Sequence, residues 1–286
     1  VVVHHSGVVH YLKSSRLRLD MRQSDRYLNC ASFAFDASIA SIWHSIGFGA
    51  SVVVLPTHAL LDGMPDIVAR YGCTMVDGTP TLMGAQSETA LQKAGVRTLI
   101  VGGEAVSADF INRFSSCMRV VNEYGPTECC VGSHSLVCSA GMRYLRSIGR
   151  PLDGLRCYVV EVATNRRLPV GVPGELCISG EQVTLGYHNR PDLTDLKFVA
   201  NPYLDGDETE DARTKYARIY KTGDLCRWLP DQSIEFLGRI DKQIKVRGYR
   251  IEKGEIENKL LEVDGVTEAV VILRPQSQSL AAFVVP

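Results

Sequence analysis

The chain has 286 residues, of which 45% are hydrophobic and 22% charged, and its 31 basic and 32 acidic side chains give a formal net charge of −1. This composition is typical of a globular protein that is long enough for one large or two modest domains. The balanced charge gives no reason to expect nucleic acid or an anionic membrane as a partner. No apolar run reaches the roughly 18 residues needed to cross a bilayer, so we expect no membrane association.

The nine cysteines are scattered along the chain and form no C-x-x-C pair. In a chain of this size, that pattern favours reduced thiols over a disulfide framework or a zinc site, and it predicts a cytoplasmic protein. Residues 1–5 contain neither an initiator Met nor a signal peptide, so we expect the chain to begin inside a larger protein.

The first part of the chain, residues 1–145, alternates β-rich runs with amphipathic stretches. Helices are predicted around 65–71, between Pro65 and Gly72, and after the N-cap residue Ser107. The alternation of strands and helices favours a parallel α/β sheet. The predicted strands cover residues 50–55, 73–76, 98–101 and 118–121.

Residues 146–240 change to short strands separated by Gly and Pro turns, which predicts a small β-rich subdomain. The acidic run 205–211 within it is expected to be a solvated surface loop. Residues 241–286, with a helix over 253–261 and a strand over 269–273, predict an incomplete C-terminal α/β lobe. The predicted fold class is therefore α/β, with a parallel-sheet subdomain, a β-rich subdomain and part of a third lobe.

Two predicted strand ends carry loops that suit a nucleotide. Gly102 and Gly103 have no Cβ, so the backbone can approach a flat ligand closely. The run 122–128, Asn-Glu-Tyr-Gly-Pro-Thr-Glu, offers the aromatic face, amide, hydroxyl and carboxylate that adenine, phosphate and Mg²⁺ require. Ligands of open α/β sheets bind at the carboxyl ends of strands, which favours this function. Taken alone, the run could also be a capped structural turn.

Two later runs add weaker signals. Asp224, on a Gly-Asp turn, can accept hydrogen bonds from two vicinal ribose hydroxyls, although such turns are common. The run 238–252 places cationic residues at alternating positions, as an exposed edge strand does. Because this run joins two predicted subdomains, it is also a candidate hinge.

In this order, these runs resemble the motifs of the adenylate-forming, AMP-binding superfamily, which includes acyl-CoA synthetases, luciferases and the amino-acid adenylation domains of nonribosomal peptide synthetases. A further motif at 174–180, followed by Gly186-Tyr187 and Arg190-Pro191, extends the resemblance along nearly the whole chain. In that family a carboxylic acid attacks the α-phosphate of ATP, and a thiol then displaces AMP. The resemblance implies ATP and Mg²⁺ as cofactors, and the phosphopantetheine of a carrier protein as the thiol.

The resemblance also implies roles for individual residues. Tyr124 would stack on adenine, with Asn122 as a second adenine contact and with Gly102 and Gly103 flanking the ring. Thr127 would contact phosphate.

For the rest of the nucleotide, the resemblance makes Glu128 the Mg²⁺ ligand and Asp224 the ribose-binding carboxylate, assisted by Arg239. Asp241 resembles the hinge residue about which the C-terminal lobe swings between the two half-reactions.

The run Phe35-Asp36-Ala37-Ser38 resembles the motif that separates amino-acid activators from acyl-CoA synthetases. A free α-ammonium in an apolar surrounding needs a carboxylate partner, and Asp36 would supply it. Alternatively, Asp36 caps a helix over 38–46.

Alignment outward from these motifs gives a set of side chains that we call the substrate-contact residues. Their small members leave room for a long side chain, and their acidic members favour a polar or cationic one, such as that of ornithine, lysine, arginine or glutamine. The set consists of Asp36, Ala37, Ala40, Asp77, Ile100, Gly102, Glu123, Val131 and Gly132.

The resemblance further implies a phosphate loop before Val1 and a lysine after Pro286, and neither Lys253 nor Lys259 lies on the right element to replace that lysine. We therefore expect weak or no activity from this chain alone. The predicted partners are an amino acid and the peptidyl carrier and condensation domains of a synthetase. An acyl- or aryl-CoA ligase and a non-catalytic nucleotide-binding remnant remain as alternatives.

Overall fold

The computed structural model divides into two compact units, Val1–Leu237 and Gly238–Pro286. Part of the acidic run predicted as a surface loop, residues 205–207, lies outside the described residues. Within the described residues, no helix is both long and apolar enough to span a membrane. The structure describes residues 1–56, 60, 63–143, 146–204, 208–241, 244–246, 249–251, 253–274 and 279–286.

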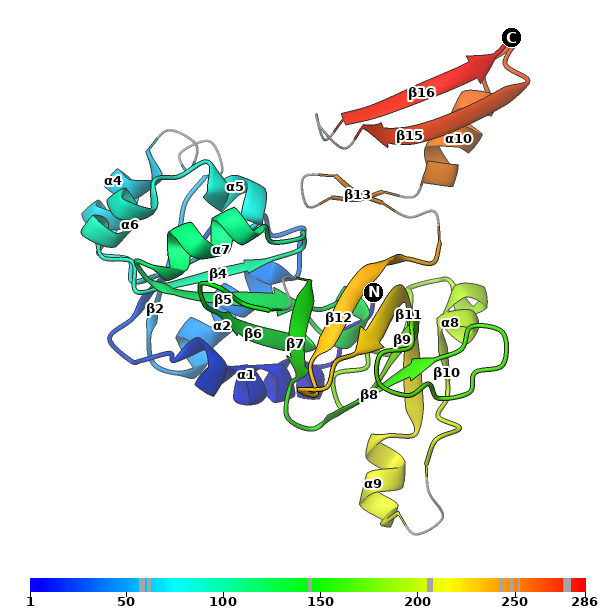
Figure 1. Cartoon of the computed structure of the whole chain (residues 1–286), viewed down its shortest axis with the longest axis horizontal. Coiled ribbons are helices and arrows are strands. Elements are labelled where there is room, and N and C mark those ends of the chain that lie inside the picture. Colours follow the sequence, from blue (N-terminus) through cyan, green and yellow to red (C-terminus); the bar gives the residue numbers. More distant parts are fainter. Residues whose placement is uncertain are drawn as a thin grey trace. The chain divides into compact units, whose positions relative to one another are not determined.

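The first unit is built on one large sheet, in the strand order β2-β1-β3-β4-β5-β6-β7-β12-β11-β9-β8, with β10 paired to β11 (Figure 1). Its first five strands are parallel, which confirms the predicted parallel α/β sheet. These strands are β2 (Ser51–Val54), β1 (Arg26–Asn29), β3 (Met75–Gly78), β4 (Thr98–Gly102) and β5 (Arg119–Tyr124).

The β-rich part continues this sheet, because β6 pairs with β5 and β7 pairs with both β6 and β12. β6 (His134–Cys138) lies before the predicted boundary at residue 146, and the β-rich part begins with β7 (Ser147–Pro151), β8 (Leu155–Val160) and β9 (Gly174–Gly180). The remaining strands are β10 (Phe198–Ala200), β11 (Arg218–Trp228) and β12 (Ile234–Arg239).

Helices cover both faces of the parallel strands (Figure 1). One hydrophobic cluster joins α4, α6 and α7 to Leu28, Val76 and Leu99, and another joins the end of α1 to the alternate strand residues, among them Tyr27 and Ile100. The helices are α1 (His5–Leu19), α2 (Ala37–Gly47), α4 (Met64–Tyr71), α5 (Pro80–Gly84), α6 (Glu88–Ala94), α7 (Ala108–Ser115), the 3₁₀ turn η1 (Thr127–Cys129), α8 (Pro191–Lys197) and α9 (Glu210–Lys215).

The predicted helix boundaries are confirmed where capping residues mark them. Pro65 lies in the first turn of α4, and Gly72 ends that helix in the left-handed conformation with φ of 61°. The hydroxyl of Ser107 accepts a hydrogen bond from the backbone N–H of Phe110 at the start of α7.

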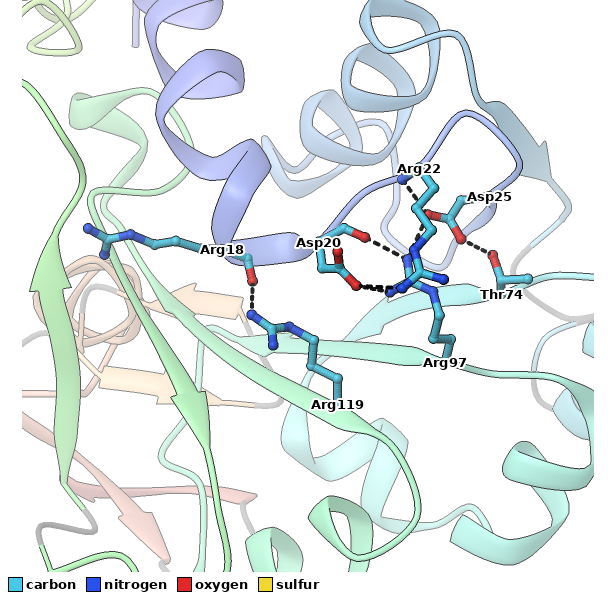
Figure 2. Close-up of polar contacts among 7 residues, drawn as sticks. All are labelled: Arg18, Asp20, Arg22, Asp25, Thr74, Arg97 and Arg119. Atoms are coloured by element: carbon cyan, nitrogen blue, oxygen red, sulfur yellow. Dashed lines mark hydrogen bonds and ion pairs between the residues drawn. The ribbon is translucent and has the colours of Figure 1, made fainter.

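A polar network fixes the amino ends of the parallel strands (Figure 2). The carboxylate of Asp25, which is 3% exposed, accepts hydrogen bonds from the guanidinium of Arg97 and the hydroxyl of Thr74, each at 2.7 Å. Arg97 also pairs with Asp20 at 2.7 Å. We call these four residues the Asp25 network. It joins the end of α1 to the starts of β1, β3 and β4, at the edge of the sheet opposite their carboxyl ends.

The described part of the second unit contains two antiparallel hairpins and a helix, which confirms the predicted helix over 253–261 and strand over 269–273. In the second hairpin, Val271 is buried and its backbone N–H donates to the carboxylate of Glu257 on the helix at 2.8 Å. The elements are β13 (Ile244–Val246), β14 (Tyr249–Ile251), α10 (Lys253–Leu261), β15 (Glu268–Arg274) and β16 (Ser279–Val285).

Candidate functional site

The carboxyl ends of β3, β4 and β5 bring four of the substrate-contact residues onto adjacent strands. Asp77 is paired in register with Ile100, and Gly102 with Glu123. Side chains along a strand alternate between faces. Asp77 and Glu123 therefore lie on the same face as Met75 and Val121, which is the face that α1 covers.

Asp77 and Glu123, which we call the acidic pair, have strongly perturbed ionisation. Burial raises the pKa of Asp77 to about 7, although its Oδ1 accepts a hydrogen bond from the backbone N–H of Cys30 at 3.1 Å. Burial also raises the pKa of Glu123 to about 7, opposed by a hydrogen bond from Tyr11 and reinforced by the charge of Asp77. Both groups are therefore poised to change charge near neutral pH.

Asp36 lies at the N-cap position of α2, and its carbonyl accepts from the backbone N–H of Ile39 at 2.8 Å. Its side chain, however, makes no capping hydrogen bond to the helix. The alternative prediction, that Asp36 is a helix cap, is therefore wrong for its carboxylate. The charge of Asp36 contributes to the raised pKa of Tyr11 and of Cys130, so the carboxylate lies near both residues.

The other substrate-contact residues lie close to α1 and α2. Ala37 begins α2, and Ala40, 5% exposed, packs in one cluster with Tyr11 of α1. Gly132 faces the same side chain, because a Cβ at this position would lie 2.7 Å from the Tyr11 ring. Val131 precedes it with φ of 72°, an uncommon conformation for a β-branched residue.

The turn that carries Val131 and Gly132 is held by Gln182, a residue that the sequence did not point to. Gln182 is fully buried, and its Nε2 donates to the carbonyls of Gly132 at 2.6 Å and Cys129 at 3.1 Å. Its Oε1 lies 3.0 Å from Nδ1 of His10 on α1. These contacts stabilise two successive left-handed residues, Cys130 and Val131.

On the nucleotide side, the structure brings Tyr124 and Asp224 together, although they come from different strands. The hydroxyl of Tyr124 donates a hydrogen bond to the carboxylate of Asp224. Asn122 is paired with Val101 of β4, next to the pairing of Gly102. Gly102 permits close backbone approach, since a Cβ there would lie 2.6 Å from the carbonyl oxygen of Glu123.

Gly103 and Thr127 lie in the two loops that are predicted to bind the nucleotide. Gly103 has φ of 81°, and a Cβ there would meet no atom within 4 Å. Thr127 begins η1, directly after Pro126.

Glu128 is fully buried in η1, and its Oε1 accepts a hydrogen bond from the hydroxyl of Tyr187 at 2.6 Å. A carboxylate is the kind of ligand that Mg²⁺ takes, so the donor chemistry fits the predicted role. The described residues contain no group of three His, Cys, Asp or Glu arranged to hold a metal.

Arg239 and Asp241 lie in the second unit, where the Nε of Arg239 donates to Oδ1 of Asp241 at 2.9 Å. Asp224 belongs to the first unit. The pairing of Arg239 with Asp224 on a ribose and the hinge role of Asp241 therefore stay predictions.

The chain belongs to the AMP-binding enzyme family, whose pattern matches residues 1–188. A linear gramicidin synthase of Brevibacillus parabrevis is 40% identical to it, with 100% of this chain and 4% of that protein aligned. Bacitracin synthase 3 of Bacillus licheniformis is 35% identical, again over 100% of this chain and 4% of that protein. The chain thus spans about 4% of the length of these relatives.

Two solved structures share the fold. The Vibrio cholerae adenylation domain AlmE, in complex with glycyl-adenosine-5'-phosphate, matches with a TM-score of 0.82 and 25% identity, covering 99% of this chain and 54% of that one. The four-domain nonribosomal peptide synthetase holo-AB3403, bound to AMP and glycine, matches with a TM-score of 0.71 and 30% identity over 99% of this chain and 21% of that one. The predicted partial adenylate-forming fold is confirmed.

Proposed function

We propose that this chain is the amino-acid-binding and nucleotide-binding part of an adenylation domain in a nonribosomal peptide synthetase. Identity of 40% with a gramicidin synthase along the whole chain supports this assignment. The observation that carries it is the meeting of two sets of residues at one sheet edge. The acidic pair lies at the ends of β3 and β5, and the Tyr124–Asp224 contact begins at the last residue of β5.

In the proposed reaction, a carboxylate oxygen of the amino acid forms a bond to the α-phosphorus of ATP, and the bond to the β-phosphate breaks to release pyrophosphate. A phosphopantetheine thiolate on a carrier domain then attacks the acyl carbon and displaces AMP. In this reaction the residues of this chain would position the reactants and stabilise charge, and they would form no covalent bond with them.

For the nucleotide, we propose that adenine stacks on Tyr124 and lies against Gly102 and Gly103, with Asn122 as a polar contact. The ribose hydroxyls donate to Asp224. The hydrogen bond from Tyr124 to Asp224 supports this assignment, because it fixes the aromatic ring and the carboxylate relative to each other.

For the triphosphate, we propose contacts from Thr127 and from Mg²⁺ held at Glu128. The ion would neutralise phosphate charge during pyrophosphate release. Arg239 would assist in binding the ribose, and Asp241 would be the hinge residue.

For the substrate, we propose that Asp36 binds the α-ammonium and that the remaining substrate-contact residues surround the side chain. The acidic pair favours a long polar or cationic amino acid, because burying a charged substrate group requires a partner of opposite charge. The partners would be peptidyl carrier and condensation domains. The nine cysteines, which form no C-x-x-C pair, are consistent with reducing cytoplasm as the location.

Isothermal titration calorimetry with sulfamoyladenosine analogues of aminoacyl adenylates tests this function without requiring turnover. We expect the lysyl or ornithyl analogue to bind at least about tenfold more tightly than the norleucyl analogue, which has a similar shape and no side-chain charge. Preference for a fatty-acyl or aryl analogue would instead indicate a CoA ligase. Equal binding of AMP and all analogues would indicate a nucleotide-binding remnant.

A further inference from the structure

Tyr11 of α1 contacts three parts of the candidate site, although no motif pointed to it. The residue is 0% exposed, and its hydroxyl donates to Oε2 of Glu123 at 2.9 Å. Its ring fills the space beside Gly132, where an added Cβ would be 2.7 Å away. The ring also packs edge-on against His44 of α2, with centroids 5.1 Å apart. One side chain thus supports α2, the 129–132 turn and the end of β5.

Tyr11 is itself held in place through α1. The Nδ1 of His44 lies 2.9 Å from the carbonyl oxygen of Ala40, which can only accept, so Nδ1 carries the proton. The Nε2 lies 2.6 Å from the hydroxyl of Ser15 on α1. Burial lowers the pKa of His44 to about 4, so this contact persists at neutral pH. The Tyr11 hydroxyl therefore has little freedom to follow Glu123 if that side chain moves.

The two oxygens of Glu123 have different surroundings. Oε2 accepts from Tyr11, whereas Oε1 is inaccessible to solvent and has no hydrogen-bond partner among the described residues. A buried carboxylate oxygen without a donor is costly. A cationic group of a bound ligand would remove that cost.

We infer that Tyr11 is a positioning residue that determines side-chain specificity, because its hydroxyl holds one oxygen of Glu123 and leaves the other for a cationic group of the substrate. The inference rests on the proposed function, which makes Glu123 a substrate contact. Tyr11 itself does not need to touch the substrate. The Tyr11 hydroxyl acts by orienting the Glu123 carboxylate and by favouring its ionised form.

The charge of Glu123 is set by groups on three elements. Burial and the charge of Asp77 on β3 raise its pKa, while the hydrogen bond from Tyr11 and the charge of Arg18, both on α1, lower it. The hydroxyl of Tyr27 on β1 also interacts with Glu123. The residues paired with Glu123 on the neighbouring strands are Gly102 and Ser135, and neither titrates. Removing the Tyr11 hydroxyl should therefore raise the pKa of Glu123 above its value of about 7.

The Tyr11→Phe variant tests this directly by ¹³C NMR titration of the Glu123 carboxyl carbon in the full chain, assigned with Glu123→Gln. We expect its midpoint to rise by about one pH unit, as the loss of a hydrogen bond to an ionised group predicts. Tyr158→Phe is the matched control, because it also removes a hydroxyl from a buried tyrosine, one that accepts from Asn201 at 3.4 Å. An unchanged midpoint in folded Tyr11→Phe overturns the inference.

The same variant should change specificity in a pH-dependent way. At pH 7 we expect Tyr11→Phe to weaken binding of lysyl-sulfamoyladenosine about tenfold and of the norleucyl analogue less than about twofold. The difference should narrow at pH 9, where Glu123 is ionised in both proteins. Equal losses for both analogues would mean that Tyr11 only supports the fold. Absence of all aminoacyl binding in the wild type would contradict the proposed function, and the NMR titration would still decide whether Tyr11 controls Glu123.

Discussion

Replacement of Asp36 by asparagine is expected to weaken binding of the lysyl-adenylate analogue by about 100-fold, because one partner of a desolvated charge pair is lost. Asparagine keeps the shape of the side chain. It also keeps the backbone contact that starts α2, in which the carbonyl of Asp36 accepts from Ile39. Since the Asp36 side chain makes no capping hydrogen bond, the melting temperature should change little. Calorimetry and thermal unfolding of the same samples separate binding from stability.

Asp109→Asn is the matched control for this variant. Asp109 also lies in the first turn of a helix, α7, but its side chain is 80% exposed. We expect no change in analogue binding. If Asp36→Asn binds the lysyl analogue as tightly as the wild type, Asp36 does not hold the α-ammonium, and the distinction between an amino-acid activator and a CoA ligase loses its main support.

Replacement of Arg97 by methionine is expected to lower the free energy of unfolding of the first unit by about 3 kcal/mol. The change leaves the buried carboxylate of Asp25 without its 2.7 Å ion pair and removes the contact to Asp20. The Asp25 network joins the end of α1 to three parallel strands, so its loss should destabilise their packing. Urea unfolding followed by the fluorescence of Trp43 and Trp228 measures the effect.

The double variant Arg97→Met, Asp25→Asn should recover part of this loss, because the unpaired buried charge is then absent. Arg190→Met is the matched control: its ion pair with Asp192 is 59% and 65% exposed and should contribute less than about 1 kcal/mol. Equal destabilisation by Arg97→Met and Arg190→Met would show that the network contributes no more than a surface pair.

Much of the fold could be predicted because its signals are local. Pro65 and Gly72 mark the ends of α4, and Ser107 caps α7, all within a few residues of the element they delimit. The extension of the sheet from β7 to β12 could not be predicted in this way. It depends on the pairing of Ile234 with Gly149, which are far apart in the sequence and carry no matching pattern.

The candidate site also combines residues that local signals predict with residues that only long-range contacts bring into place. The residues at the ends of β3, β4 and β5 could be predicted, because each lies within a short motif. The residues that hold them could not, since Tyr11, Gln182 and Tyr187 act on partners that lie 112, 50 and 59 residues away. Tyr187 stood in a motif, but nothing in that motif indicated Glu128 as its partner.

The most direct test of the central claim is ATP–pyrophosphate exchange, measured with this chain across the standard amino acids, ornithine, and a set of fatty and aryl acids. Since weak or no activity is expected from this chain alone, we predict at most slow exchange, and any exchange should depend on an amino acid with a polar or cationic side chain. Exchange that depends on fatty or aryl acids, and on no amino acid, would contradict amino-acid activation.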